Sequence, residues 1–124
     1  MTASNYAELE ILDWIAGNGA PAAVSNVYVK MHLGDPGEDC TGNPAAETTR
    51  AAASFGAAAS GSVANDVAVQ WTNVSTSETW SHFSLWDAST AGNPLAYGAL
   101  SASKALTATD NAEFAIGALT VTCD

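Results

Sequence analysis

Basic side chains are nearly absent from this 124-residue sequence, which contains three Lys or Arg residues against thirteen Asp or Glu residues and has a net charge of −10. The three cations, Lys30, Arg50 and Lys104, are scattered along the chain. Binding to a nucleic-acid backbone needs clustered cations that displace counterions, and anionic membrane surfaces attract the same positive charge. The sequence therefore predicts that neither nucleic acid nor a membrane is a partner.

A long apolar run and a secretory leader are also missing. No stretch approaches the roughly 20 apolar residues that span a bilayer. The opening residues MTASNYAELE lack the basic and apolar regions of a signal peptide, so we expect a protein made and kept in a cytoplasm. Cys40 and Cys123 are then expected to be free thiols, because disulfides persist mainly in oxidising compartments. A bridge formed after release from the cell is the alternative.

Low charge does not indicate disorder in this chain. Of its residues 48% are hydrophobic, and four Trp, three Tyr and three Phe are available for a core. Disordered chains combine low hydrophobicity with few aromatic residues. The length suits a single domain over residues 1–124.

One helix is predicted, over residues 5–16. Asn5 and Glu8 have the spacing of a capping box, and Gly17 stands where a glycine ends a helix. The helical spacing gives an apolar stripe of Leu9, Leu12 and Ile15. We expect this stripe to pack on the body of the domain, with a helix that binds a partner as the alternative.

The body, residues 26–124, shows short β-type segments separated by Gly, Asn, Asp and Ser, without a helical pattern between them. The segments expected to be strands are 26–33, 49–55, 62–71, 79–86, 95–100, 104–107, 112–116 and 119–123. Such spacing is typical of antiparallel sheets rather than βαβ units. The predicted fold is mainly β: an antiparallel, jelly-roll-like β-sandwich of about seven or eight strands with one short N-terminal helix.

Catalytic residues are not predicted. His82, Ser84 and Asp87 lie close together in sequence, but no nucleophile-elbow sequence accompanies them. A triad needs its members in one hydrogen-bonded line beside an oxyanion hole. We therefore expect no enzyme and interpret His82 as part of an aromatic strip with Trp80 and Trp86.

Metal and cofactor sites are not predicted either. Asp35, Glu38 and Asp39 lie in a Gly- and Pro-rich loop over residues 34–47, but their spacing does not match an EF-hand. A solvated acidic loop is the preferred interpretation, and a weak cation site is the alternative. The two Cys and two His residues lack the paired spacing of zinc ligands.

The order of segments nevertheless resembles a known family. The stretches are NVYVKMHLGDPG, Arg50 leading to Phe55, VANDVAVQW, ETWSHFSLWDASTAGNPLAYGAL and a last segment from Asp110 that ends in ALTVTCD. Together they resemble small virion proteins of tailed bacteriophages, especially phages of actinobacteria, which are labelled tail-fibre or head-decoration proteins. The resemblance covers about residues 5–124, and Trp80 to Leu100 is its most specific part. Thr49 departs from it, since an aromatic residue is expected there.

The resemblance implies a non-enzymatic virion component assembled in the host cytoplasm. A capsid decoration protein is the first expectation, because the chain is a single domain without a fibrous repeat. A tail-fibre or tail-tip protein is the alternative. A carbohydrate-binding host-attachment module is the second alternative, with Trp71, Trp80, Trp86 and Tyr97 as stacking candidates.

The expected partners are further copies of the chain, with a trimer favoured, and the major capsid protein or tail proteins. Two regions are predicted to make these contacts. The residues are Leu9, Leu12 and Ile15 of the helix stripe and Asp35, Glu38 and Asp39 of the acidic loop.

Overall fold

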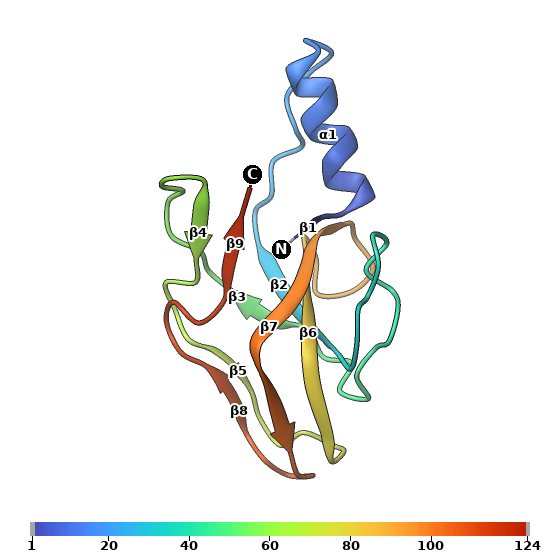
Figure 1. Cartoon of the computed structure of the whole chain (residues 1–124), viewed down its shortest axis with the longest axis vertical. Coiled ribbons are helices and arrows are strands. Elements are labelled where there is room, and N and C mark those ends of the chain that lie inside the picture. Colours follow the sequence, from blue (N-terminus) through green and yellow to red (C-terminus); the bar gives the residue numbers. More distant parts are fainter. Residues whose placement is uncertain (1, 124) are drawn as a thin grey trace.

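A computed structural model of the chain describes residues 2–123 and shows a β-rich body from which one helix projects (Figure 1). The elements are β1 (Thr2–Ala3), α1 (Asn5–Ile15), β2 (Val27–His32), β3 (Ala51–Ala53), β4 (Ser62–Ala64), β5 (Val69–Trp71), β6 (Glu78–Trp86), β7 (Pro94–Leu106), β8 (Ala112–Phe114) and β9 (Thr120–Thr122). All strand pairs are antiparallel. The expected fold class, mainly antiparallel β with one short helix, is confirmed.

The main layer is a five-stranded sheet in the order β1-β7-β6-β2-β3. Its centre is the pairing of β2 with β6, in which Met31 lies opposite Phe83 and Val29 opposite Leu85. These four side chains are buried. Because alternate residues of a strand share one face, they form one apolar face of the sheet.

Two short ribbons, β4-β9 and β5-β8, take the place of a second broad sheet. The β5-β8 ribbon packs on the main sheet through aromatic rings. Trp71 meets Trp80 with 5.2 Å between ring centroids and Phe114 with 5.9 Å, both edge to face. The core therefore lies between β6 of the sheet and this ribbon.

Strand boundaries differ from the expectation in three places, so that residues 2–123 form nine strands. Segments 95–100 and 104–107 join into β7, β1 is added, and segment 62–71 splits into β4 and β5. The split follows from Asn65, whose side-chain amide donates to the carbonyl of Val67 at 2.9 Å. Short polar side chains that bind nearby backbone favour turns over strands.

Trp80 lies on a different face from the one its sequence position indicates. Alternation places it with His82, Ser84 and Trp86, yet it belongs to the same core as Phe83 and Leu85. The register of β6 against β7 shifts between Trp80 and His82. A bulge of this kind redirects the side chains that follow it along a strand, so the predicted aromatic strip is wrong for Trp80.

The helix ends are formed by Ser4 and Gly17. Ser4, not Asn5, is the N-cap, and its side chain accepts a hydrogen bond from the backbone N–H of Ala7. The predicted capping box with Glu8 is therefore wrong. Gly17 has φ of 79° and donates to Trp14, while Asn18 donates to Asp13, which forms a Schellman motif. No helix in residues 2–123 is long and apolar enough to cross a membrane.

The turn between β6 and β7 explains the sequence segment that carried the family resemblance. Asp87 accepts hydrogen bonds from the backbone and side-chain nitrogens of Asn93. Arg50 donates to the carbonyls of Ala88 and Ala91 and lies 3.8 Å from the Trp86 ring centroid. These residues hold the hairpin against β3, so the most specific part of the sequence is structural.

Candidate interaction surface

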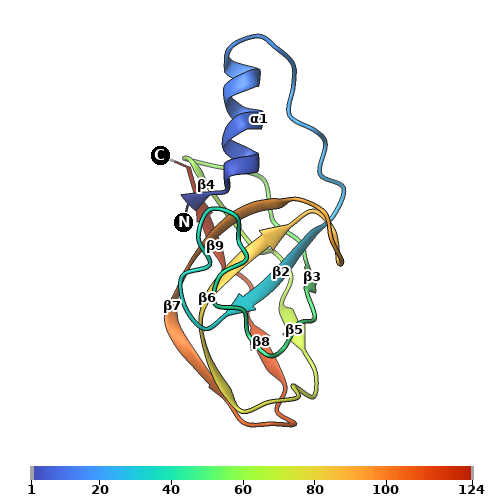
Figure 2. The ribbon, with the colours of Figure 1, turned by 90° about the vertical axis from the view of Figure 1, so that its right-hand side faces the viewer.

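Residues 5–26 form an arm that consists of α1 and the segment returning from it to β2. The arm projects from one end of the body (Figures 1 and 2). No residue of α1 is buried, and Leu9, Leu12 and Ile15 are 66%, 60% and 71% exposed. The expectation that this stripe packs on the body is wrong. The reason is geometric: α1 follows β1 at the edge of the sheet, and only its first turns lie close to the body.

The returning segment covers the acidic side of α1. Glu10 accepts a hydrogen bond from the backbone N–H of Ala22 at 2.8 Å, and Asp13 accepts one from the side-chain amide of Asn18 at 3.3 Å. Successive helix residues are rotated by about 100°, which places Leu12 and Ile15 on the opposite side from Glu10 and Asp13. The apolar side of the arm is thus left uncovered.

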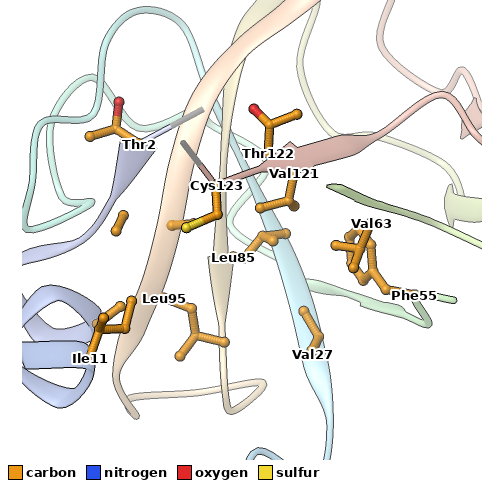
Figure 3. Close-up of a pocket in the computed structure, with 13 residues that line it drawn as sticks. Thr2, Ile11, Val27, Phe55, Val63, Leu85, Leu95, Val121, Thr122 and Cys123 are labelled. Carbon is orange, nitrogen blue, oxygen red and sulfur yellow. The ribbon is translucent and has the colours of Figure 1, made fainter. Parts of the chain in front are cut away.

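An apolar groove of about 530 Å³ lies at the base of the arm (Figure 3). Its walls come from the sheet, the β4-β9 ribbon and α1. The lining residues include Ile11, Val27, Phe55, Val63, Leu95 and Val121. Cys123 and Thr122 of the β9 end also line it, and no charged side chain of residues 2–123 does.

The groove and the uncovered side of the arm form one apolar surface. Ala7 and Ile11 of α1 line the groove, and Trp14 and Ile15, one turn further along, lie on the same side of the helix. Monomeric proteins rarely expose contiguous apolar surface of this kind unless it binds something. Sequence reasoning found the helix stripe but not the groove, since its walls come from segments far apart in the chain.

The acidic loop is folded against its own sheet. Asp35 accepts a hydrogen bond from the backbone of Gly37 and Asp39 one from that of Thr41, so both carboxylates stabilise turns. The backbone oxygen of Glu38 accepts from Asn5 and thereby joins the loop to the start of α1. None of the three side chains is buried. Their role as partner contacts stays a prediction, as does that of the helix stripe.

The polar cluster closest to catalytic chemistry is buried. His32 Nδ1 is 2.8 Å from the carbonyl of Gly42, which can only accept, so Nδ1 carries the proton. Ser84 Oγ lies 2.7 Å from His32 Nε2 and also accepts from Trp86 Nε1 at 2.8 Å. Ser84 therefore donates to a neutral His32. Because both residues are fully buried, the pair has the hydrogen bonding of a nucleophile and base but no access to substrate.

The His32 cluster predicts a loss of stability in mild acid. Burial lowers the pKa of His32 below its ordinary value, so the unfolded chain binds the proton more readily than the folded one. Stability from this group is complete above about pH 6.5 and is lost as the pH falls through the lowered pKa. Urea unfolding at about pH 7.5 and about pH 5.5 measures this.

Replacing His32 tests the assignment. In His32→Gln the loss between the two pH values should be smaller than in the wild type, whereas the control His82→Gln should keep it. A His32→Gln variant with the full wild-type loss would show that another group is responsible.

Metal binding and carbohydrate binding, which the sequence left open, find little support in the geometry. Within residues 2–123 no three His, Cys, Asp or Glu side chains are grouped as metal ligands. Carbohydrate binding would need exposed rings, but Trp71, Trp80 and Trp86 are all buried. Those three residues therefore offer no stacking platform to a sugar.

The two thiols are expected to react very differently. Cys40 is buried beneath the acidic loop, and burial raises its pKa to about 11. Cys123 is exposed at the rim of the groove. Only a thiolate reacts readily with a disulfide reagent, so one thiol per chain should titrate in the native protein and two after unfolding in urea. Cys123→Ser should abolish the native reaction, and Cys40→Ser should leave it unchanged.

The fold and surface define a small antiparallel β domain that presents an uncovered helical arm for association. A sequence profile of one family, described as podophage GP4 fiber I protein gp80, matches residues 2–122. The chain therefore belongs to this family of phage virion structural proteins, and its fibre-related character agrees with the tail-fibre alternative. The description does not extend to phages of actinobacteria in particular. No curated protein matches the chain.

Proposed function

We propose that this protein is a non-enzymatic component of the fibre apparatus of a tailed-phage virion. The observation that carries the proposal is membership, over residues 2–122, of a family described by a podophage fibre protein. The geometry supports the same view, because the most enzyme-like cluster, His32 with Ser84, is buried. The uncovered arm supplies the means of attachment.

Decoration of the capsid is the competing placement. A single domain with an attachment arm suits either position, and the net charge of −10 suits any exposed virion surface. The family description favours the fibre.

Labelling the protein in purified particles separates the two placements. Particles carrying an affinity tag on the body are incubated with gold-labelled antibody and imaged by electron microscopy. Label confined to the tail vertex and its fibres is the expected result. Label spread over the whole head, with a copy number that follows the capsid lattice, would establish decoration instead.

Self-association through the arm is the second element of the proposal. Virion components of this size act in closed oligomers, because each copy then buries surface that it cannot bury alone. The apolar side of α1 is such a surface, since Leu9, Leu12 and Ile15 are more than half exposed. The interacting partners are accordingly other copies of this chain and the neighbouring virion proteins to which they attach.

A further inference from the structure

We infer that the apolar groove is the receptor for the arm of a second copy of this chain. In this arrangement the uncovered side of α1 from one copy lies in the groove of the next. The inference rests on the self-association proposed above and goes beyond it by naming both halves of the contact.

The area of the arm fits a stable contact between copies. Its exposed apolar side chains are Leu9, Ile11, Leu12, Trp14, Ile15 and Val24. From their exposed fractions, they offer roughly 700 Å² on each chain, and a standard interface takes about 800 Å² from each partner. The arm alone thus supplies most of one side of an interface, and the groove supplies the matching side.

The groove has the size and chemistry to receive these side chains. An apolar cavity of roughly 150 Å³ accommodates a benzene ring, so a groove of about 530 Å³ has room for several side chains of the size of Leu or Ile. Within residues 2–123 its lining offers Val, Leu and Phe side chains and no charge. Burying apolar side chains there removes surface from water on both copies.

A chain cannot fill its own groove with these side chains. Ser4, at the base of the arm, is fully buried; its backbone donates to Leu95 at 3.1 Å and its hydroxyl to Pro94 at 2.6 Å. These bonds fix the start of α1, whose residues Ala7 and Ile11 already form one wall of the groove. Leu12 lies about 100° around the helix from Ile11, which turns it away from that wall. The occupant must therefore come from another molecule.

Charge makes this the most favourable place for two acidic chains to meet. With a net charge of −10, identical copies repel one another over most of their surfaces. The groove lining described above is uncharged, and Glu10 and Asp13 of the arm lie beneath the returning segment. Since each copy offers one arm and one groove, the contact closes as a reciprocal pair or a ring.

Paired variants test the two halves of the contact by light scattering over a range of concentrations. Leu12→Asp with Ile15→Asp on the arm, and Thr122→Lys at the groove, should each weaken self-association by at least about tenfold. The controls are Val67→Asp, at another exposed apolar site, and Thr120→Lys, on β9 but outside the groove lining. Both should leave self-association unchanged, and circular dichroism should show all four variants folded.

Cross-linking identifies what the arm touches. Leu12→Cys is treated with a short bismaleimide, with native Cys123 as the reactive thiol at the groove rim. A covalent link between the introduced thiol of one copy and Cys123 of another is expected, and it should disappear in the Cys123→Ser background. Mass spectrometry of the linked peptides, with isotopically labelled and unlabelled chains mixed, separates links between copies from links within one.

Three outcomes are decisive. An oligomer linked from arm to groove supports the inference. An oligomer whose arm links only to another arm, also in Cys123→Ser, overturns the inference but retains the proposed self-association. A protein that stays monomeric at high concentration overturns both, while the placement in the fibre apparatus is tested separately by labelled particles.

Discussion

Replacing Trp80 with alanine is expected to lower the free energy of unfolding by about 3–5 kcal/mol, the range for removal of a large aromatic side chain from a core. Trp80 is 0% exposed and packs edge to face on Trp71. Its Nε1 also donates to Glu78 at 2.9 Å, and Glu78 in turn accepts from the backbone of Ala46 and Glu47. The substitution therefore opens a cavity at the centre of the core and loosens a bond network that ties β6 to the segment before β3.

Trp14 supplies a matched control in the same chain. It is 60% exposed on the arm, so Trp14→Ala should change stability by no more than about 0.5 kcal/mol. Both variants are compared by urea unfolding at one protein concentration, because oligomers unfold in a concentration-dependent way. The arm variant Leu12→Asp with Ile15→Asp serves as a common background that removes this dependence. Equal losses for Trp80→Ala and Trp14→Ala would contradict the placement of the core.

The strands were predictable from the sequence because each depends on local signals. β2 and β6 show alternation or dense aromatic content, and Gly92 with Asn93 marks the turn after β6. The face of Trp80 was not predictable, since the register shift next to it arises from pairing with β7. Local pattern therefore identified the strands but not the bulge that decides which side chains enter the core.

The candidate site was predictable only in part. A stripe such as Leu9, Leu12 and Ile15 has the same pattern whether it packs on its own domain or on another molecule. What decides between them is the direction in which α1 leaves the sheet, and that depends on the buried Ser4 and its bonds to β7. The groove and the pair of His32 with Ser84, 52 residues apart, depend equally on tertiary placement.

The stability of the body and the availability of the arm are linked. The body uses its large side chains internally: Trp71, Trp80 and Trp86 are buried, while Trp14 on the arm is not. In residues 2–123 every buried polar side-chain atom has a hydrogen-bond partner. Such a body is satisfied without neighbours, whereas the arm is not. Loss of association should consequently leave the body folded.

Asn65→Asp is expected to destabilise the protein by about 3 kcal/mol or more at neutral pH, because it places an unpaired charge in the interior. Asn65 is buried, and its amide nitrogen donates to the carbonyls of Val67 and Ala115 at 2.9 Å. Its oxygen accepts from the backbone of Leu119 at 2.9 Å. Aspartate has the same shape but presents oxygens to both carbonyls, so two attractive contacts become repulsive.

The pH dependence separates this explanation from simple loss of packing. A buried carboxyl group next to carbonyl oxygens has a raised pKa, so the destabilisation by Asn65→Asp should decrease as the pH falls and the carboxyl takes up a proton. Asn65→Ala, which only removes the hydrogen bonds, should cost about 2–3 kcal/mol without that dependence. The exposed Asn73 gives the control, and Asn73→Asp should cost no more than about 0.5 kcal/mol. If Asn65→Asp were as stable as the wild type at neutral pH, the side chain of Asn65 could not be what holds the turn before β5 against the segment between β8 and β9.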